Sequence, residues 1–276
     1  MKLKRYALAA ILAAAHLNSP AAKGEVYVND FYIPQPEPFS IDAGDSYTSV
    51  YVTDSSHIAI SGGSILNIDQ EFARAPLYME DDSRADILGG HLKVQYNSFL
   101  GPNVIDVRDN VALNIAGGLF EAVGPSSNVL MMRTLANVNI SGGTFTANGD
   151  HVLYMFGGFL GMQLNIRGGH FQTLQANDVD LLMTAPNDNG TANIFGSSFH
   201  LDGAPISAGP LLALSGTLSV IYANGQAEEI TFANNGGKIN LIEIPEPISA
   251  ATATTAIAAI GLFRRRFRRR ESQMNS

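Results

Sequence analysis

A pair of glycines recurs along this chain of 276 residues at nearly constant spacing. The first glycines of successive copies are 27, 28, 25, 26 and 28 residues apart, and the last copy is the weaker pair Gly196-Ser197. A unit of this length repeats when one supersecondary element stacks on copies of itself, because a single unit cannot bury its apolar face alone. The spacing therefore predicts a stacked repeat. The first glycines are Gly62, Gly89, Gly117, Gly142, Gly168 and Gly196.

Apolar residues hold fixed places relative to each diglycine. Isoleucine stands two places before it, an aliphatic residue or alanine four places before it, and isoleucine, leucine or phenylalanine three places after its first glycine. Apolar residues at every second place are typical of strands, and glycine permits a tight bend between them. Each copy thus predicts two strands joined at a corner. The three sets are Ile60, Ile87, Ile115, Ile140, Ile166 and Ile194; Ile58, Ala85, Leu113, Val138, Leu164 and Ala192; and Ile65, Leu92, Phe120, Phe145, Phe171 and Phe199.

A third apolar run closes each repeat. Three short strands per repeat predict an all-β parallel, right-handed β-helix (solenoid) of about six to seven coils over residues 55–214. Equivalent residues would then stack about 4.8 Å apart. An antiparallel β-sandwich is the alternative, because it also has short strands between turns. The runs are Leu77–Met79, Val104-Ile105, Val129–Met132, Val152–Met155, Leu181–Met183 and Leu211–Leu214.

Three features follow one another at the C-terminus. The tripeptide Pro245-Glu246-Pro247 precedes an apolar segment, residues 248–263, and then a basic cluster. As a helix, sixteen residues span about 24 Å, somewhat less than the roughly 30 Å hydrocarbon core of a bilayer. Arginines behind such a helix bind lipid headgroups and stop translocation. We expect a membrane helix here; a helix packed on a soluble core and an arginine run that binds nucleic acid are the alternatives. The cluster is Arg264, Arg265, Arg266, Arg268, Arg269 and Arg270.

This order of parts, over residues 245–276, resembles the PEP-CTERM sorting signal, the substrate tag of exosortases in Gram-negative bacteria that make extracellular polysaccharide. The resemblance implies that an exosortase is the partner that processes the chain near Pro245–Pro247. It also implies a precursor held in inner-membrane lipid and then a place at the cell surface or in the extracellular matrix. A permanently anchored, uncut protein is the alternative. Residues 214–243 resemble the last segment of repeat-bearing PEP-CTERM proteins, which implies a C-terminal cap over residues 215–244.

The N-terminus predicts export. Residues 1–21 combine basic residues, an apolar stretch over residues 6–17 and small residues that suit cleavage after Ala21, with Ser19 at the −3 place. We expect a cleaved signal helix, with an uncleaved anchor as the alternative. Residues 22–54 then form an N-terminal cap or linker. The chain has no cysteine, so disulfides do not stabilise it in an oxidising compartment.

The body of the chain, residues 22–247, is strongly acidic. Of the 25 acidic residues only Glu271 lies outside the body, and nine of the 17 basic residues do. That leaves 24 acidic and eight basic side chains, a net charge of −16. Such a charge argues against nucleic acid or anionic lipid as a partner of the folded surface. Glycans and cations remain compatible with it.

A polar residue stands three places before the first glycine in five repeats. Stacked amides hydrogen-bond along a solenoid, so we expect a structural ladder. The alternative is a stripe of donors and acceptors along which exopolysaccharide could lie. The residues are Asp86, Asn114, Asn139, Asn165 and Asn193.

Catalytic chemistry has weak support. Glycan cleavage needs convergent carboxylates, or calcium ligands beside a base, and the candidate acids occupy different places in different repeats. The histidines lack partners at metal-ligand spacing. We therefore expect no enzyme, metal or cofactor, but an exported structural or adhesive protein that associates with glycans or cations. A polysaccharide lyase or glycoside hydrolase is the alternative. The candidate acids are Glu80, Asp81, Asp82, Asp106, Asp109, Asp150, Asp178 and Asp180, and the histidines are His57, His91, His151, His170 and His200.

Overall fold

The computed structural model describes residues 39–53, 55–68, 75–96, 103–157, 161–175, 178–184 and 190–245. Within these ranges the chain is all-β, and none of the described segments is a helix that could cross a membrane. The expected signal helix, with Ser19 and Ala21, lies outside the described residues, as do the segment 248–263 and the arginine cluster.

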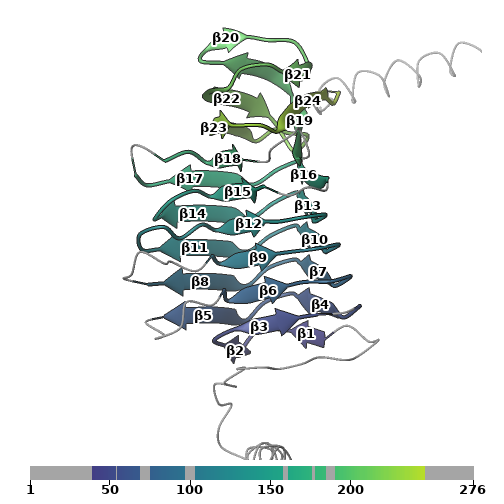
Figure 1. Cartoon of the computed structure of the whole chain (residues 1–276), viewed down its shortest axis with the longest axis vertical. Helices are drawn as coiled ribbons and strands as arrows, with labels where there is room; N and C mark the ends of the chain where they lie inside the picture. Colours follow the sequence, from purple (N-terminus) through teal and green to yellow (C-terminus); the bar gives the residue numbers. More distant parts are fainter. Residues whose placement is uncertain are drawn as a thin grey trace, which may run out of the picture.

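The strands stack in three parallel columns that form a β-solenoid (Figure 1). Three consecutive strands make one rung, and the solenoid makes about five turns between β1 and β16, which leaves the expected count of six to seven coils unconfirmed. Sheet 1 contains β1 (Phe39–Ile41), β4 (His57–Ile60), β7 (Arg84–Ile87), β10 (Ala112–Ile115), β13 (Asn137–Ile140) and β16 (Met162–Ile166). Sheet 2 contains β2 (Ser46–Tyr47), β5 (Ser64–Ile68), β8 (His91–Gln95), β11 (Leu119–Val123), β14 (Thr144–Asn148) and β17 (His170–Thr173). Sheet 3 contains β3 (Val50–Val52), β6 (Leu77–Met79), β9 (Ile105–Val107), β12 (Leu130–Met132), β15 (Leu153–Phe156) and β18 (Leu181–Thr184).

The repeat positions coincide in space. Each isoleucine before a diglycine pairs with its counterpart on the next rung, as Ile115 does with Ile87 and Ile140, and these side chains are buried. The phenylalanines behind the corner stack inside the rod: Phe120 and Phe145 have ring centroids 4.7 Å apart, and Phe145 and Phe171 are 5.1 Å apart. Parallel pairing between successive rungs excludes the alternative β-sandwich for this part of the chain.

The two glycines of a corner serve different needs, as Gly142 and Gly143 show. A Cβ on Gly142 would lie 2.3 Å from the carbonyl oxygen of Ala116 on the rung below, so the first glycine permits close stacking. Gly143 has a φ of 103°, a conformation that residues with a side chain rarely adopt. Both requirements hold in a stacked corner, which explains why glycines come in pairs.

The sixth repeat departs from this pattern. Gly196 and Ser197 do not separate two strands, because they lie inside β19 (Gly190–Leu201), a strand of 12 residues whose pairing with β22 shifts register between Ser197 and His200. The expected run Leu211–Leu214 forms no third strand of a rung either. Its first residue ends β21 (Gly209–Leu211), which pairs antiparallel with β24 (Lys238–Glu243). At the other end, residues 39–52, expected as part of an N-terminal cap or linker, already form the first rung.

The strands that follow β19, which include those of residues 215–244, lie at the C-terminal end of the rod. β23 (Ala227–Asn234) pairs parallel with β18 and extends sheet 3. β19 pairs parallel with β16, and β24 pairs parallel with β19, so both extend sheet 1. The remaining strands, β20 (Ala204–Pro205), β21 and β22 (Ser215–Ile221), add antiparallel pairs around them. Among the described residues, no such strand is added to sheet 2, which ends at β17.

Side chains cap the open edge of β17 instead. The backbone N–H of Phe171 donates to Glu228 at 2.9 Å, and that of Thr173 donates to Asp180 at 2.9 Å. The side-chain amide of Gln226 donates to the carbonyl of Gly169 at 3.1 Å. These backbone N–H and C=O groups, which could otherwise pair with a further strand, are thus hydrogen-bonded to side chains of the same molecule.

Candidate functional site

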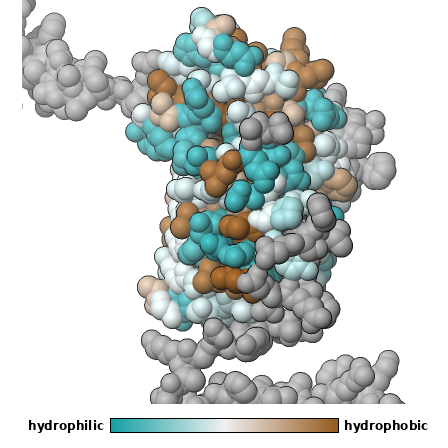
Figure 2. Space-filling view, turned by 90° about the vertical axis from the view of Figure 1, so that its left-hand side faces the viewer, coloured by the Kyte–Doolittle hydropathy of each residue, from teal (hydrophilic) through white to brown (hydrophobic). Residues whose placement is uncertain are grey.

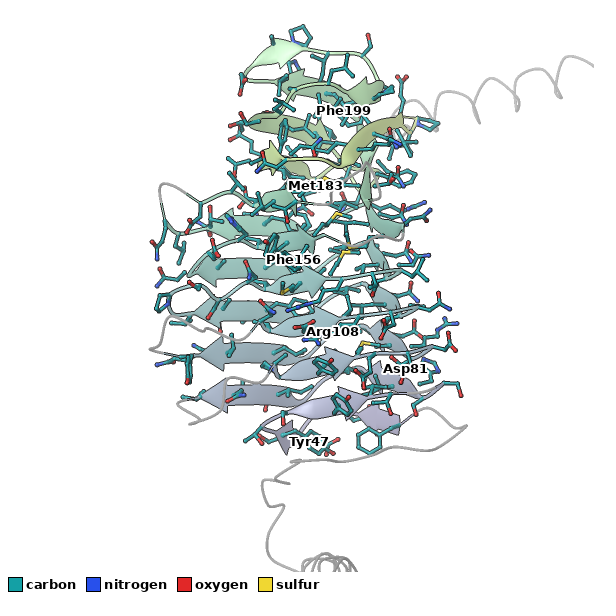
Figure 3. All side chains as sticks on the ribbon, viewed as in Figure 1. Tyr47, Asp81, Arg108, Phe156, Met183 and Phe199 are labelled. Atoms are coloured by element: carbon teal, nitrogen blue, oxygen red, sulfur yellow. The ribbon has the colours of Figure 1, made fainter. Side chains whose placement is uncertain are left out.

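The outer face of sheet 3 carries aromatic and charged side chains along several rungs. In each of these short strands the middle residue points away from the interior of the rod, and its two neighbours point into it. In β6, for example, Leu77 and Met79 are buried, whereas Tyr78 is half-buried. This outer side also carries Glu80, Arg108 and Arg133, each directly after its strand, and Phe156, the last residue of β15. Figure 3 shows Phe156 above Arg108. We call this surface the aromatic–ionic face. It comprises Tyr51, Tyr78, Glu80, Asp106, Arg108, Arg133, Tyr154 and Phe156.

Two tyrosines and a glutamate lie at the N-terminal end of the aromatic–ionic face. The rings of Tyr51 and Tyr78 stack with centroids 4.7 Å apart, since the two residues are opposite in the register of β3 and β6. Both hydroxyls donate to Glu80, that of Tyr78 at 3.0 Å. Burial and the bond to Glu80 raise the pKa of Tyr78 to about 12. The tyrosines are therefore neutral, oriented rings at physiological pH.

Asp106 is held by two arginines at the middle of the face. Its side chain is only 8% exposed and accepts from Arg108 at 3.3 Å and from Arg133 at 3.4 Å. The guanidinium of Arg108 also lies 4.8 Å from the centre of the Tyr78 ring, and that of Arg133 lies 5.6 Å from the centre of the Phe156 ring. Buried charge of this kind is tolerated because it is paired and hydrogen-bonded. The arrangement fixes charged donors between aromatic rings.

The five residues of the expected polar ladder are joined on the outer face of sheet 1. Each asparagine amide donates to the side-chain oxygen on the rung below, at distances from 2.6 to 3.0 Å. The chain of bonds ends at Asp86, whose second oxygen lies 2.8 Å from Nε2 of His57. Burial would raise the pKa of Asp86, but the bonds from Asn114 and His57 and the charge of Arg84 lower it below its usual value. All five side chains are half-buried and hydrogen-bonded to one another, an arrangement that matches the expected structural ladder between rungs.

Asn240 extends the ladder by one step and was not among the sequence candidates. It lies opposite Asn193 in β24 and donates to it at 3.1 Å. No diglycine follows Asn240 at the repeat spacing, so the repeat pattern gave no signal for it. Only the parallel pairing of β24 with β19 brings it into register.

The other candidate acids do not form one catalytic cleft. Asp82 accepts from Asn110, and Asp81 and Asp109 occupy left-handed corner positions with φ of 61° and 56°. Asp180 is buried and accepts from the N–H groups of Thr173 and Thr231. These placements are explained by turns and packing.

Asp150 and Asp178 do approach each other, together with His151. One potential ligand atom from each lies within 4.8 Å of the others, and this is the one such group among the described residues. Burial and the charge of Asp150 raise the pKa of Asp178, against the effect of His151. Nε2 of His151 lies 3.0 Å from Asp150.

The remaining histidines have separate neighbours. His91 contacts Glu121 at 2.6 Å, His170 contacts Glu228 at 3.1 Å, and Nδ1 of His200 lies 2.9 Å from the carbonyl of Ser198. His91 and His170 share a register position on sheet 2 but are three rungs apart, so they cannot bind one metal ion together.

The tripeptide at which we expect processing lies at the boundary of the described residues. Pro245 is exposed just beyond β24, whereas Glu246 and Pro247 lie outside the described residues. Comparison of the chain with known protein families, with curated proteins and with solved structures finds no match.

Proposed function

We propose that this protein is an exported structural or adhesive scaffold whose aromatic–ionic face binds a linear glycan. The observation that supports this most directly is the alternation of rings and fixed charges along sheet 3, where Tyr51, Tyr78 and Arg108 lie on successive rungs. Aromatic rings present flat apolar surface, and oriented charged groups bind hydroxyls or carboxylates at their rim.

The geometry of the rod favours a polymer over a compact ligand. Rungs repeat about every 4.8 Å, so the face offers similar groups at regular intervals along its length. Its charged groups are already oriented by neighbours: Asp106 by two arginines and Glu80 by two tyrosines. Little side-chain entropy is then lost when a ligand binds.

Delivery is the second part of the proposal. The signal-like N-terminus and the tail that resembles a PEP-CTERM signal support export and exosortase processing, with residence at the cell surface or in the extracellular matrix. An acidic, cysteine-free body that stacks its own strands suits a protein that must be stable outside the cell without disulfides.

The test is binding of the full chain to a panel of neutral and acidic polysaccharides by affinity electrophoresis. Tyr78→Ala should weaken binding roughly tenfold, because loss of one aromatic contact costs about 1–2 kcal/mol. Tyr78→Phe should retain most of it, since the ring remains. Thr146→Ala, on the outer face of sheet 2, is the matched control and should change nothing.

Two results would contradict the proposal. Equal binding by Tyr78→Ala, Arg108→Ala and the unaltered protein would show that the face is not the site. Release of reducing ends or unsaturated products from any of these glycans would instead identify a hydrolase or lyase.

A further inference from the structure

Among the described strands, sheet 2 ends at β17, whereas β19 and β24 extend sheet 1 and β23 extends sheet 3. A pocket of about 490 Å³ lies beside β17, where a further strand of sheet 2 would pass. Its walls come from β17, β19, β22 and β23, which Figure 1 shows at the junction between the rod and its C-terminal end. We call it the end pocket. Figure 2 views the rod from the side toward which the strands of sheet 2 point in Figure 1, where hydrophilic and apolar surface alternate. Its lining includes His170, His200, Ser219, Ile221, Glu228 and Glu229.

A buried carboxylate organises the polar side of the end pocket. The side chain of Glu228 is 4% exposed, and one of its oxygens accepts from the backbone N–H of Phe171 at 2.9 Å. The same carboxylate lies 3.1 Å from Nδ1 of His170. A carboxylate that binds one ring nitrogen fixes the orientation of the imidazole and directs its other nitrogen outward. Nε2 of His170, whose side chain is half exposed, is thereby offered to a ligand.

Further polar groups meet His170 from other elements. His200 on β19 and Ser219 on β22 are opposite each other in an antiparallel pair, and both line the pocket. Nδ1 of His200 faces the carbonyl of Ser198 at 2.9 Å, which again leaves Nε2 of the ring for other partners. The exposed carboxylate of Glu229 adds an acceptor at the rim.

Apolar surface forms the rest of the wall. Phe171, Val220, Ile221 and Ala227 contribute it between the polar groups. The two glutamates disfavour phosphate and carboxylate ligands by like-charge repulsion. Imidazole, hydroxyl and carboxylate groups can hydrogen-bond the hydroxyls at the rim of a sugar ring, and an apolar wall can contact the C–H groups on its face. The volume lies within the range of about 300–1,000 Å³ that small-molecule sites occupy.

We propose that the end pocket binds a single neutral sugar residue, held by His170, His200 and Ser219 against Ile221. This site shares no residue with the aromatic–ionic face. A glycan could therefore contact the rod in two ways, with its length along sheet 3 and with a terminal residue in the end pocket.

The experiment is titration of the full chain with glucose, galactose and N-acetylglucosamine, each followed by NMR signals of the histidine rings. At least one sugar should shift the signals of His170 and His200 at millimolar concentration. His170→Gln and Ser219→Ala should each weaken that binding at least tenfold. Glu228 is left unchanged because it also caps β17.

His91→Gln is the matched control. His91 has the same register position on sheet 2, three rungs away, and also faces a glutamate, Glu121. The His91→Gln variant should leave sugar binding unchanged, as should Tyr78→Ala. The melting temperature of each variant shows whether it is folded. If His170→Gln does not fold, Ser219→Ala still tests the end pocket.

The proposal is wrong if none of the three sugars binds the unaltered protein. It is also wrong if binding persists in folded His170→Gln and Ser219→Ala, or if Tyr78→Ala abolishes it, since the sugar would then bind elsewhere. Loss of polysaccharide binding in Tyr78→Ala with monosaccharide binding retained would support both sites separately. Polysaccharide binding that Tyr78→Ala leaves intact contradicts only the aromatic–ionic face.

Discussion

Single side chains on the outer face of sheet 1 link one rung to the next. Each asparagine of the ladder donates toward the N-terminal end of the rod, so every amide dipole points the same way and the last donor meets the carboxylate of Asp86. Hydrogen bonds arranged in such a series polarise one another. The ladder thus favours the ionised form of Asp86, as its lowered pKa indicates.

This arrangement makes stability depend on pH. Because the pKa of Asp86 is lower in the folded protein than in the unfolded chain, ionised Asp86 contributes stability above about pH 4 and loses it as the pH falls. Asp86→Asn should lower the free energy of unfolding by about 1–2 kcal/mol at pH 7 and by clearly less at pH 3. Urea unfolding at the two pH values measures the difference. An equal deficit at both would contradict the role of the charge.

Stacking at the element scale depends on corners that leave no room for a side chain. Gly142→Ala places a Cβ 2.3 Å from a backbone oxygen, which cannot move without displacing the rung below. We expect a loss of about 2–4 kcal/mol in the free energy of unfolding. Denaturant titration measures it.

Gly225→Ala separates the two roles of glycine. Gly225 has a φ of 84°, but a Cβ added to it would have no other atom within 4 Å, so this variant bears only the conformational cost of about 1–2 kcal/mol. If Gly142→Ala costs no more than Gly225→Ala, close approach between rungs is not what the first glycine provides.

At the scale of the whole molecule, the two ends of a solenoid determine whether the rod stops growing. Asp180 joins the last rung to the C-terminal strands, because its carboxylate accepts from the N–H groups of Thr173 and Thr231 and from the hydroxyl of Thr231 at 2.7 Å. Its side chain is buried, so these bonds are shielded from water.

Asp180→Ala should therefore detach the C-terminal strands before the rungs unfold. Nearest-neighbour stability in stacked repeats allows one end to open by itself. We expect faster amide hydrogen exchange across residues 215–234 and, from the exposed edge of β17, more association than in the unaltered protein. Asp180→Asn, which retains an acceptor, should show a smaller effect. Unchanged exchange and unchanged light scattering in Asp180→Ala would contradict this.

Much of the regular rung could be predicted from the sequence. Period-two alternation around a diglycine is a local pattern, and the places of Ile115, Phe145 and Asn139 follow from it because identical positions stack in a parallel fold. The position at which the repeat ends could not be predicted in this way. The sequence has Gly196 and Ile194 at the places of a normal corner, yet Gly196 lies inside β19, where β24 pairs with it in parallel and β22 pairs antiparallel from Ser197 onward.

The repeat pattern alone was enough to predict the period of the rod, the columns of isoleucine and phenylalanine in its interior, and the amide ladder on the outer face of sheet 1. Short-range stereochemistry and burial suffice for these features. Where the rod ends, and which side chains meet on its surface, became visible only in three dimensions. The aromatic–ionic face joins residues from five rungs, and the end pocket exists because distant strands extend two sheets and leave the third without one. Such contacts depend on which segment lies above another, and no local pattern encodes that.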